Sequence, residues 1–370
     1  MNNDLLYQIA LTKIPNIGHV HAKMLIKYFE NAQQIFNTPR NKLEKIDGIG
    51  FVRANNIKAF KDYKSCEYEI EFIKKNNIQP LFVSDKDYPK RLLNCYDAPV
   101  LLYYKGNISL NKTKFISVIG TRSNSEYGKI ICEKFIADLS KHDVTIISGL
   151  AYGIDTIAHK SAIKNNLSTI AVLAHGLDRI YPYANKKLSE EITEQGGLLT
   201  EYTSGTNPDK QNFPGRNRIT AGICEALVII ETGKTGGSLI TAELANSYNK
   251  DVFAVPGRVS DPKSEGCNNL IKNNKACLIT KADDLLEIMN WEEKINKPQL
   301  RQRELFFQLT ADESKLVAIL KLVKEADIDT LTYNSTISYS AVACALLSLE
   351  LNGIIQLMPG KRYKLLDANI

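Results

Sequence analysis

The sequence predicts an α/β fold built on a doubly wound, mostly parallel sheet, with a helical domain before it and a winged-helix-like domain after it. Between residues 111 and 290, short apolar runs alternate with amphipathic helical patterns, as expected for buried parallel strands with helices on both faces. Glycine-bearing turns follow several of these runs, at the strand ends where such sheets bind ligands. The length of 370 residues accommodates two or three domains.

Residues 1–65 form the predicted helical domain and contain a near repeat. Ile14-Pro15-Asn16-Ile17-Gly18 precedes one apolar helical pattern, and Ile46-Asp47-Gly48-Ile49-Gly50 precedes another. Such turns resemble the helix-hairpin-helix (SAM-like) module, whose turn N–H groups contact DNA phosphates without reading sequence. Asn16 stands where the first copy should have its leading glycine. The alternative is a small helical domain whose helices end at glycine caps.

The next two regions are a connection and the predicted Rossmann-like domain. Residues 66–110 contain the turn signals Asp87-Tyr88-Pro89 and Asp97-Ala98-Pro99, and we expect them to pack on the core. Residues 111–290 have helical patterns at 130–139 and 154–162. The predicted strands are Phe115–Ile119, Val144–Ile147, Thr169–Ala174, Leu198–Thr200, Ala226–Ile230 and Val252–Val255.

The polar residues 291–304 are predicted to be a linker to a winged-helix-like domain at 305–370. Ser338 is a plausible N-cap for the helix that ends at Leu351. This helix would take the recognition position, but it carries no basic residue, so a packing or protein-contact role is favoured over DNA recognition. The other predicted elements are a helix at 312–324 and a hairpin of Ile354–Met358 and Arg362–Leu366.

Composition indicates a globular protein of the cytoplasm. The chain is 44% hydrophobic and 24% charged, without an apolar run of about 18 residues or a secretory signal pattern. Its seven cysteines and five histidines show no metal-ligand spacing, so we expect reduced thiols and no metal. The net charge of +6 is modest. A polyanion would therefore have to bind local clusters, or a surface doubled by dimerisation.

Turns at three strand ends predict an anion site. Gly120 and Arg122 follow the first predicted strand, and Gly149 follows the second. Glycine lets the backbone approach a ligand closely, and the N-terminus of the next helix favours an anion. Arginine among such turns points to phosphate, belonging either to a free nucleotide or to a polynucleotide. Further candidate positions in these turns are Gly153, Gly237 and Ser238.

A second candidate segment is Phe213-Pro214-Gly215-Arg216-Asn217-Arg218, which we place in a turn just before an apolar helix. In one hypothesis Arg216 and Arg218 form salt bridges within the domain. In the other they clamp phosphate while Phe213 stacks on a base, as in proteins that hold single strands. The second hypothesis is favoured because the segment is expected near the glycine turns.

Other phosphate-binding and catalytic signatures fit poorly. Gly233-Lys234-Thr235 resembles the end of a Walker A loop, but Val228 occupies the position of its first glycine. No G-x-G-x-x-G motif follows the first predicted strand, which disfavours a dinucleotide cofactor, and we expect no cofactor. Glu231 and Glu243 are more typical of caps or surface groups than of a general acid or base. His159 is expected to pack or cap.

Together these motifs resemble the DprA family, also called Smf, the DNA-processing proteins of bacterial natural transformation. The match is dense between residues 80 and 290 and agrees in order and spacing. The matching segments are Asp87-Tyr88-Pro89, Asp97-Ala98-Pro99, 118–122, 148–155 with Ala158-His159, Gly176-Leu177-Asp178-Arg179, Tyr181-Pro182, 213–218, 237–242, 252–257, Gly266-Cys267-Asn268 and Leu270-Ile271.

The resemblance implies a homodimer, not an enzyme. It implies that this homodimer binds single-stranded DNA without sequence preference, protects it and loads the RecA recombinase onto it. It further implies a DNA pocket that uses Arg122, Lys210 and Phe213. His175 departs from the family pattern, which usually has a smaller residue there, and Gly236-Gly237-Ser238 replaces the common Ser-Gly-Ser. The expected DNA-binding residues are Gly120, Arg122, Gly149, Gly153, Lys210, Phe213, Arg216, Arg218, Gly237 and Ser238.

Two other classes of protein are alternatives. Residues 236–243 resemble the glycine-rich loop of lysine-decarboxylase-like nucleotide phosphoribohydrolases, in which Glu243 would act as the catalytic carboxylate on a nucleoside monophosphate. A protein adaptor with a vestigial pocket is the third possibility, and it predicts that substitution of Arg122 has no effect on DNA binding.

Overall fold

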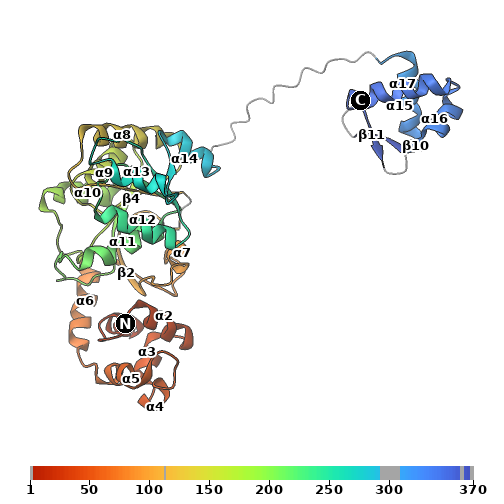
Figure 1. Cartoon of the computed structure of the whole chain (residues 1–370). Coiled ribbons are helices and arrows are strands. Elements are labelled where there is room, and N and C mark those ends of the chain that lie inside the picture. The colour runs from red at the N-terminus through yellow and green to blue at the C-terminus, as the bar shows by residue number, and fades with distance from the viewer. Residues whose placement is uncertain (1–2, 112–113, 292–308, 359–361, 367–370) are drawn as a thin grey trace. The chain divides into compact units, whose positions relative to one another are not determined.

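The computed structural model describes residues 3–111, 114–291, 309–358 and 362–366 (Figure 1). The chain divides into two compact units, Met1–Glu292 and Glu293–Ile370. The predicted linker at 291–304 lies outside the described residues, apart from Trp291. No helix in the described ranges has the length and apolarity needed to cross a membrane.

The first unit begins with helices that share one apolar core, in which Ile9, Leu25 and Ile35 are fully buried. The same core takes in Phe82 and Tyr103 of the first two strands, so the helices pack against one edge of the sheet. The last of these helices continues to Lys75. The helices are α1 (Asn3–Thr12), α2 (His19–Tyr28), α3 (Ala32–Asn37), α4 (Arg40–Leu43), α5 (Gly50–Ala59) and α6 (Tyr63–Lys75).

The two predicted turns of this helical region share a backbone conformation. Gly48 has φ 74° and Asn16 has φ 63°, and asparagine tolerates this left-handed region better than most residues. The Arg53 side chain donates hydrogen bonds to the carbonyl oxygens of Asn16 at 3.0 Å and Gly48 at 3.1 Å. Asn16 can therefore form the same turn as glycine, and Arg53 links the two copies.

Nine strands in residues 79–106 and 115–278 form one sheet, in the order β1-β2-β6-β5-β4-β3-β7-β8-β9. From β6 to β9 the neighbours are parallel, while β1 and β2 are antiparallel at one edge. The predicted doubly wound, mostly parallel sheet is confirmed. The strands are β1 (Gln79–Phe82), β2 (Leu101–Gly106), β3 (Phe115–Ile119), β4 (Thr145–Ser148), β5 (Ser168–Val172), β6 (Gly197–Thr200), β7 (Ala226–Ile229), β8 (Asp251–Ala254) and β9 (Cys277–Leu278).

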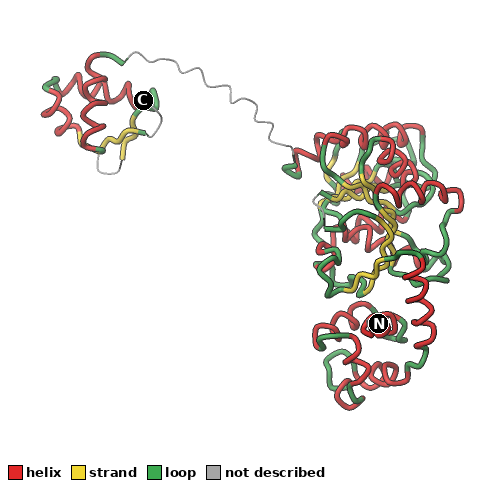
Figure 2. Tube along the Cα trace, turned by 180° about the vertical axis from the view of Figure 1, so that it is seen from behind, coloured by secondary structure: helices red, strands yellow, loops and turns green. Residues whose placement is uncertain are grey.

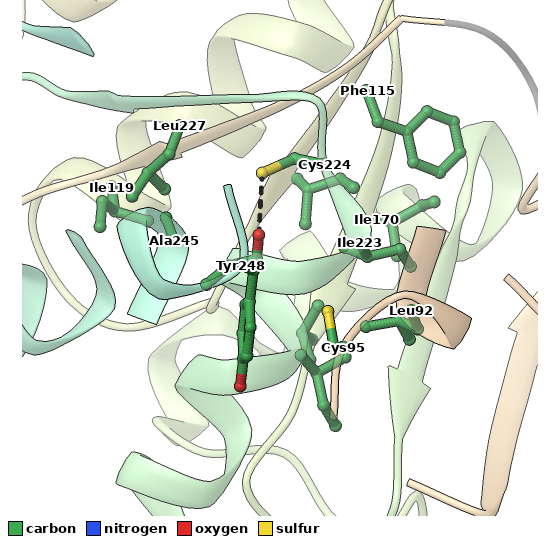
Figure 3. Close-up of a cluster of buried hydrophobic side chains, with 14 of the residues drawn as sticks. Leu92, Cys95, Phe115, Ile119, Ile170, Ile223, Cys224, Leu227, Ala245 and Tyr248 are labelled. Carbon is green, nitrogen blue, oxygen red and sulfur yellow. Dashed lines mark hydrogen bonds between the residues drawn. The ribbon is translucent and has the colours of Figure 1, made fainter. Parts of the chain in front are cut away.

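Helices cover both faces of this sheet (Figure 2). Along β3, Phe115 and Ile119 face a core shared with α7, α11, α12 and α13, part of which is drawn in Figure 3. Ile116 and Val118 face the opposite core, shared with α8, α9 and α14. The helices and 3-10 turns are α7 (Lys90–Leu93), α8 (Glu126–Asp138), η1 (Leu139–Lys141), α9 (Ile154–Lys164), η2 (Tyr183–Asn185), α10 (Lys186–Gln195), α11 (Asn212–Ile223), α12 (Gly237–Ser247), α13 (Glu265–Lys272) and α14 (Ala282–Ile288).

The order of winding opens a crevice at the centre of the sheet. Strands β4, β5 and β6 extend to one side of β3, and β7, β8 and β9 extend to the other. The loop after β3 leads to α8 on one face, whereas the loop after β7 leads to α12 on the opposite face. Because neighbouring loops diverge there, the carboxyl ends of β3 and β7 are where this architecture binds ligands.

The second unit has its own small core, with Leu316, Leu331 and Leu349 fully buried. Ser338 is the N-cap of α17, since its side chain accepts a hydrogen bond from the N–H of Ala341. Three strands pair in the order β10-β12-β11. The turn at Pro359-Gly360 lies outside the described residues. The elements are α15 (Ala311–Val323), β10 (Glu325–Asp327), α16 (Ile328–Ser335), α17 (Tyr339–Leu351), β11 (Ile355–Met358) and β12 (Arg362–Leu365).

Candidate ligand pocket at the strand ends

A pocket of about 530 Å³ lies at the central crevice, a volume typical of small-ligand sites. The loops after β3, β4, β5, β6 and β7 and the first turns of α9, α11 and α12 form its wall. The structure thus brings together most of the positions predicted from the sequence. Those that line the pocket are Gly120, Arg122, Gly149, Lys210, Phe213, Arg216, Gly237 and Ser238.

One wall of the pocket combines two cations with an aromatic ring. The guanidinium carbon of Arg122, an exposed residue, lies 5.0 Å from the centroid of the Phe213 ring. Lys210 is also exposed and lines the same pocket. A cation over a ring face is attracted by the negative charge of that face. Arg122 therefore helps to hold Phe213 while its charge stays accessible to an anion.

The segment 213–218 is helical, which corrects the expectation of a turn before a helix. α11 begins at Asn212, and Pro214 lies in its first turn, where proline is tolerated. Residues three and four positions apart share a face of a helix. Phe213, Arg216 and Asn217 accordingly face the pocket together.

Arg216 forms the floor of the pocket. Its side chain is only 5% exposed, and Nη1 donates hydrogen bonds to the carbonyl oxygens of Gly149 at 2.5 Å and Val172 at 2.7 Å. Its guanidinium carbon lies 6.0 Å from the Phe213 centroid. Because its donors are partly used by the backbone, Arg216 supplies positive potential and support beneath the pocket.

A buried carboxyl accompanies this arginine. Asp155 lines the pocket and accepts a hydrogen bond from the N–H of Ala151 at 3.3 Å. Burial raises the pKa of Asp155, while the charge of Arg216 opposes that rise. Burial likewise lowers the pKa of Arg216, and Asp155 opposes that change. The two charges partly compensate each other beneath the pocket.

Arg218 does not line the pocket, although the sequence predicts it to be a DNA-binding residue. Its guanidinium donates to a Glu201 carboxylate oxygen and to the carbonyl oxygen of Asp97. Arg218 and Glu201 are both nearly buried. Residues two positions apart on a helix point to different faces, so Arg216 and Arg218 cannot act as one clamp. The environment of Arg218 agrees with the first hypothesis, in which the arginines of this segment form salt bridges within the domain.

The glycines allow close packing of loops under the pocket. A Cβ atom at Gly149 would lie 2.1 Å from Nη1 of Arg216. Gly153 is not in the lining, but its φ is 76°, and a Cβ atom there would lie 2.3 Å from the carbonyl oxygen of Thr121. Gly153 therefore supports the loop that carries Arg122. Gly237 is different, because a Cβ atom there would meet only Asn217, at 3.7 Å.

The N-terminus of α12 borders the pocket. Its N-cap is Gly236. Glycine has no side chain that could accept hydrogen bonds from the first N–H groups of the helix. Ser238 is buried, and its hydroxyl donates to Oγ1 of Thr232 at 2.7 Å. This helix end adds partial positive charge to that of Arg122 and Lys210.

Tyr181 lines the pocket as well, although the sequence alone did not indicate it as a site residue. Its ring is 6.1 Å from that of Phe213, with the two planes inclined at 64°. The segment Tyr181-Pro182 resembles the family and could have pointed to Tyr181 as a site residue. Sequence spacing, however, gives no indication that Tyr181 lies beside Phe213.

The candidate catalytic groups lie elsewhere. Glu243 is not a lining residue; it is exposed and pairs with Lys275 at 3.6 Å. Glu231 is buried and accepts hydrogen bonds from the N–H and hydroxyl of Ser125, so it acts as a cap. His159 is fully buried, with Nδ1 2.7 Å from Oγ1 of Thr169. Within the described ranges, no cluster of three or more His, Cys, Asp or Glu could hold a metal ion.

Comparison with known proteins gives consistent matches. The model of a family described as DNA recombination-mediator protein A matches residues 79–290. Protein Smf of Synechocystis is 32% identical over 394 residues, which cover 98% of this chain and 99% of that protein. DNA processing protein DprA of Streptococcus pneumoniae is 46% identical over 204 residues, which cover 55% of this chain and 72% of that protein.

Two solved structures are similar to this one. The X-ray structure of DprA from Streptococcus pneumoniae has a TM-score of 0.68 and 37% identity, covering 76% of this chain and 97% of that one. A structure of DNA processing protein A from Helicobacter pylori, described as giving insights into its single-stranded DNA binding mode, has a TM-score of 0.53 and 29% identity. It covers 58% of this chain and 98% of that one.

Proposed function

The chain belongs to the DNA recombination-mediator protein A family, and we propose that its pocket binds single-stranded DNA without sequence preference. The match to the family model and to Protein Smf of Synechocystis confirms the resemblance to the DprA/Smf family that was inferred from the sequence. The observation that carries the proposal is the wall of Arg122, Lys210 and Phe213. Two accessible cations beside an aromatic ring suit a phosphate and its neighbouring base.

The geometry favours a flexible single strand over a duplex. Phe213 lies within a pocket about 530 Å³ in volume, so only a base that has left its stack can reach the ring. A single strand offers such bases readily, whereas a duplex must first be unstacked. The Helicobacter pylori relative supports this proposal, because its structure is described in terms of single-stranded DNA binding.

We further propose that the protein works in the cytoplasm as a homodimer that protects single strands and loads RecA onto them. The family description as a recombination mediator supports this role. The net charge of +6 is modest for a protein that binds a polyanion, and two pockets on one dimer would double that cationic surface. Measurement of the mass of the free protein in solution tests the homodimer. RecA filament assembly on oligo-dT, with and without the protein, tests the loading of RecA.

The phosphoribohydrolase alternative receives no support from the pocket. Glu243, its proposed catalytic carboxylate, pairs with Lys275 outside the lining. Incubation with AMP is expected to release no free base. Release that is abolished by Glu243→Gln would favour the enzyme instead.

The decisive experiment measures binding to labelled oligo-dT and to a matched duplex at two salt concentrations. Arg122→Ala, Lys210→Ala and Phe213→Ala should each weaken binding to oligo-dT. Loss of one phosphate contact should also reduce the slope of log K against log salt by about 0.7. Lys187→Ala is the matched control, because Lys187 is 90% exposed on α10. Absence of oligo-dT binding by folded wild-type protein would refute the proposal.

A further inference from the structure

His175 holds the loop that carries Tyr181. It is only 2% exposed and lies between β5 and Tyr181 in the chain. Its Nδ1 is 2.9 Å from the carbonyl oxygen of Gly176, and its Nε2 is 3.2 Å from the backbone nitrogen of Tyr181. One imidazole ring thus links His175 to Tyr181, six positions further along the chain.

These contacts fix the protonation of the ring. A carbonyl oxygen only accepts hydrogen bonds, so Nδ1 must carry the proton that it donates to Gly176. A backbone N–H only donates, so Nε2 must be unprotonated to accept from Tyr181. Both bonds exist together only in the neutral ring with the proton on Nδ1. A second proton, on Nε2, would set that N–H against the backbone N–H of Tyr181, and both groups are donors.

The loop delivers Tyr181 to the pocket. The Tyr181 side chain is 43% exposed, and Phe213 is the other aromatic residue among the described residues that line the pocket. The two rings meet edge to face, with centroids 6.1 Å apart. A base stacked on Phe213 would therefore have a second aromatic surface beside it, and adjacent aromatic rings let successive bases of a strand stack.

We propose that Tyr181 is a second base-stacking residue of the site and that neutral His175 positions it. This inference rests on the proposed binding of single-stranded DNA. Tyr181 would contact a base, whereas His175 acts only through Tyr181. The inference also gives the binding site a dependence on pH.

The charged groups around His175 set the direction of that dependence. Burial lowers the pKa of His175, Asp178 on the same loop raises it, and Arg216 on α11 lowers it further. Because the pKa of His175 is lowered on balance, its ring is neutral at every pH above the ordinary histidine value of 6.5. The Tyr181 contact is lost only as the pH falls below that value. Binding should therefore weaken on acidification.

A double-mutant cycle tests the positioning role. Tyr181→Ala should weaken binding to oligo-dT at pH 7.5 by roughly 5- to 150-fold, the range for loss of one stacked base. Tyr181→Phe keeps the ring and should bind like the wild type. His175→Ala should weaken binding, but adding it to Tyr181→Ala should cause no further loss. Additive losses, or wild-type affinity in Tyr181→Ala, would overturn the inference.

The conservative variant His175→Gln supplies the pH test. The glutamine amide has an NH2 group that donates and a carbonyl oxygen that accepts, and it does not titrate, so it should restore binding at pH 7.5. As the pH is lowered in steps from 7.5, the wild type should lose more affinity for oligo-dT than this variant, and the difference should begin below the ordinary histidine value of 6.5. Equal losses in the two proteins would overturn the pH-dependent part of the inference.

Hydrogen exchange in the free protein separates this inference from the proposed function. The Tyr181 amide should be protected in the wild type and in His175→Gln, and should exchange faster in His175→Ala. If the wild type does not bind oligo-dT, the proposed function fails while the amide protection still tests the His175 contact. If Phe213→Ala weakens binding and Tyr181→Ala does not, only the further inference fails.

Discussion

The carboxylate of Glu69 accepts three hydrogen bonds from Ser204, a residue 135 positions away. The Ser204 N–H lies 3.0 Å from each carboxylate oxygen, and the Ser204 hydroxyl donates to Oε2. Glu69 lies on α6 and is only 4% exposed. Ser204 lies in the loop between β6 and α11 that also contains Lys210. The N-terminal helical region therefore anchors a loop of the pocket.

Glu69→Ala should loosen that loop. It leaves the Ser204 N–H and hydroxyl without their acceptor. An unsatisfied polar group costs about 1–3 kcal/mol when fully buried, and Ser204 is half-buried, so the loss should lie at or below the low end of that range. We expect faster hydrogen exchange at Ser204, lower stability to urea and weaker binding to oligo-dT. Glu71→Ala is the matched control, because Glu71 is exposed on the same helix. Unchanged exchange at Ser204 would show that Glu69 does not anchor the loop.

Two glycines of the pocket should respond differently to alanine. At Gly149 the added Cβ atom would lie 2.1 Å from the Arg216 guanidinium, whereas at Gly237 it would meet only Asn217, at 3.7 Å. Gly149→Ala should lower the unfolding free energy by about 1–3 kcal/mol, the usual range for overpacking. Gly237→Ala should change it by less than about 0.5 kcal/mol. Urea denaturation of both variants checks this, and similar losses would contradict the packing described for Arg216.

The arginines should separate into structural and binding residues. Arg218→Ala removes the arginine partner of the buried Glu201 carboxylate and leaves it with His19, whose Nε2 lies 2.9 Å from Oε2. Removal of one partner from a buried ion pair costs up to about 3–5 kcal/mol of stability. Arg122→Ala alters an exposed side chain and should change stability by less than about 0.5 kcal/mol while weakening binding to oligo-dT. Thermal unfolding and oligo-dT titration of both variants distinguish the two effects. A stable Arg218→Ala variant with a selective binding defect would contradict the structural role of Arg218.

Buried His159 should make the protein sensitive to acid. Burial lowers the pKa of His159 to about 3 from an ordinary value of 6.5. Between these values the unfolded chain binds a proton that the folded protein does not, so stability falls as the pH falls. The contribution is about 1.4 kcal/mol per pH unit below the ordinary value. Urea denaturation at pH 7.5, 6.0 and 5.0 should show a shallower decline for His159→Gln, and parallel declines would contradict the lowered pKa.

The elements of the sheet could be predicted from the sequence because their signals are local. A continuous apolar run such as Phe115–Ile119 is stable only when both of its faces are buried, and it forms β3 with the expected bounds. Ser338 caps α17 as expected, since a serine N-cap needs only the next few N–H groups. The glycine turns also took their expected places, because the carboxyl ends of parallel strands meet at one edge of the sheet.

Only the tertiary structure decided how the side chains of these elements meet. Arg216 and Arg218 look equivalent in sequence, but the helical conformation from Asn212 onward turns one toward the pocket and the other toward Glu201. The approach of Tyr181 to Phe213 depends on the order in which the strands assemble, which no local pattern encodes. The sequence by itself thus determined the family, the six strands from β3 to β8 and the edge of the sheet where the glycine turns lie, whereas β1, β2 and β9 were not predicted from it. Long-range packing determined which cations reach the pocket and which are used in the core.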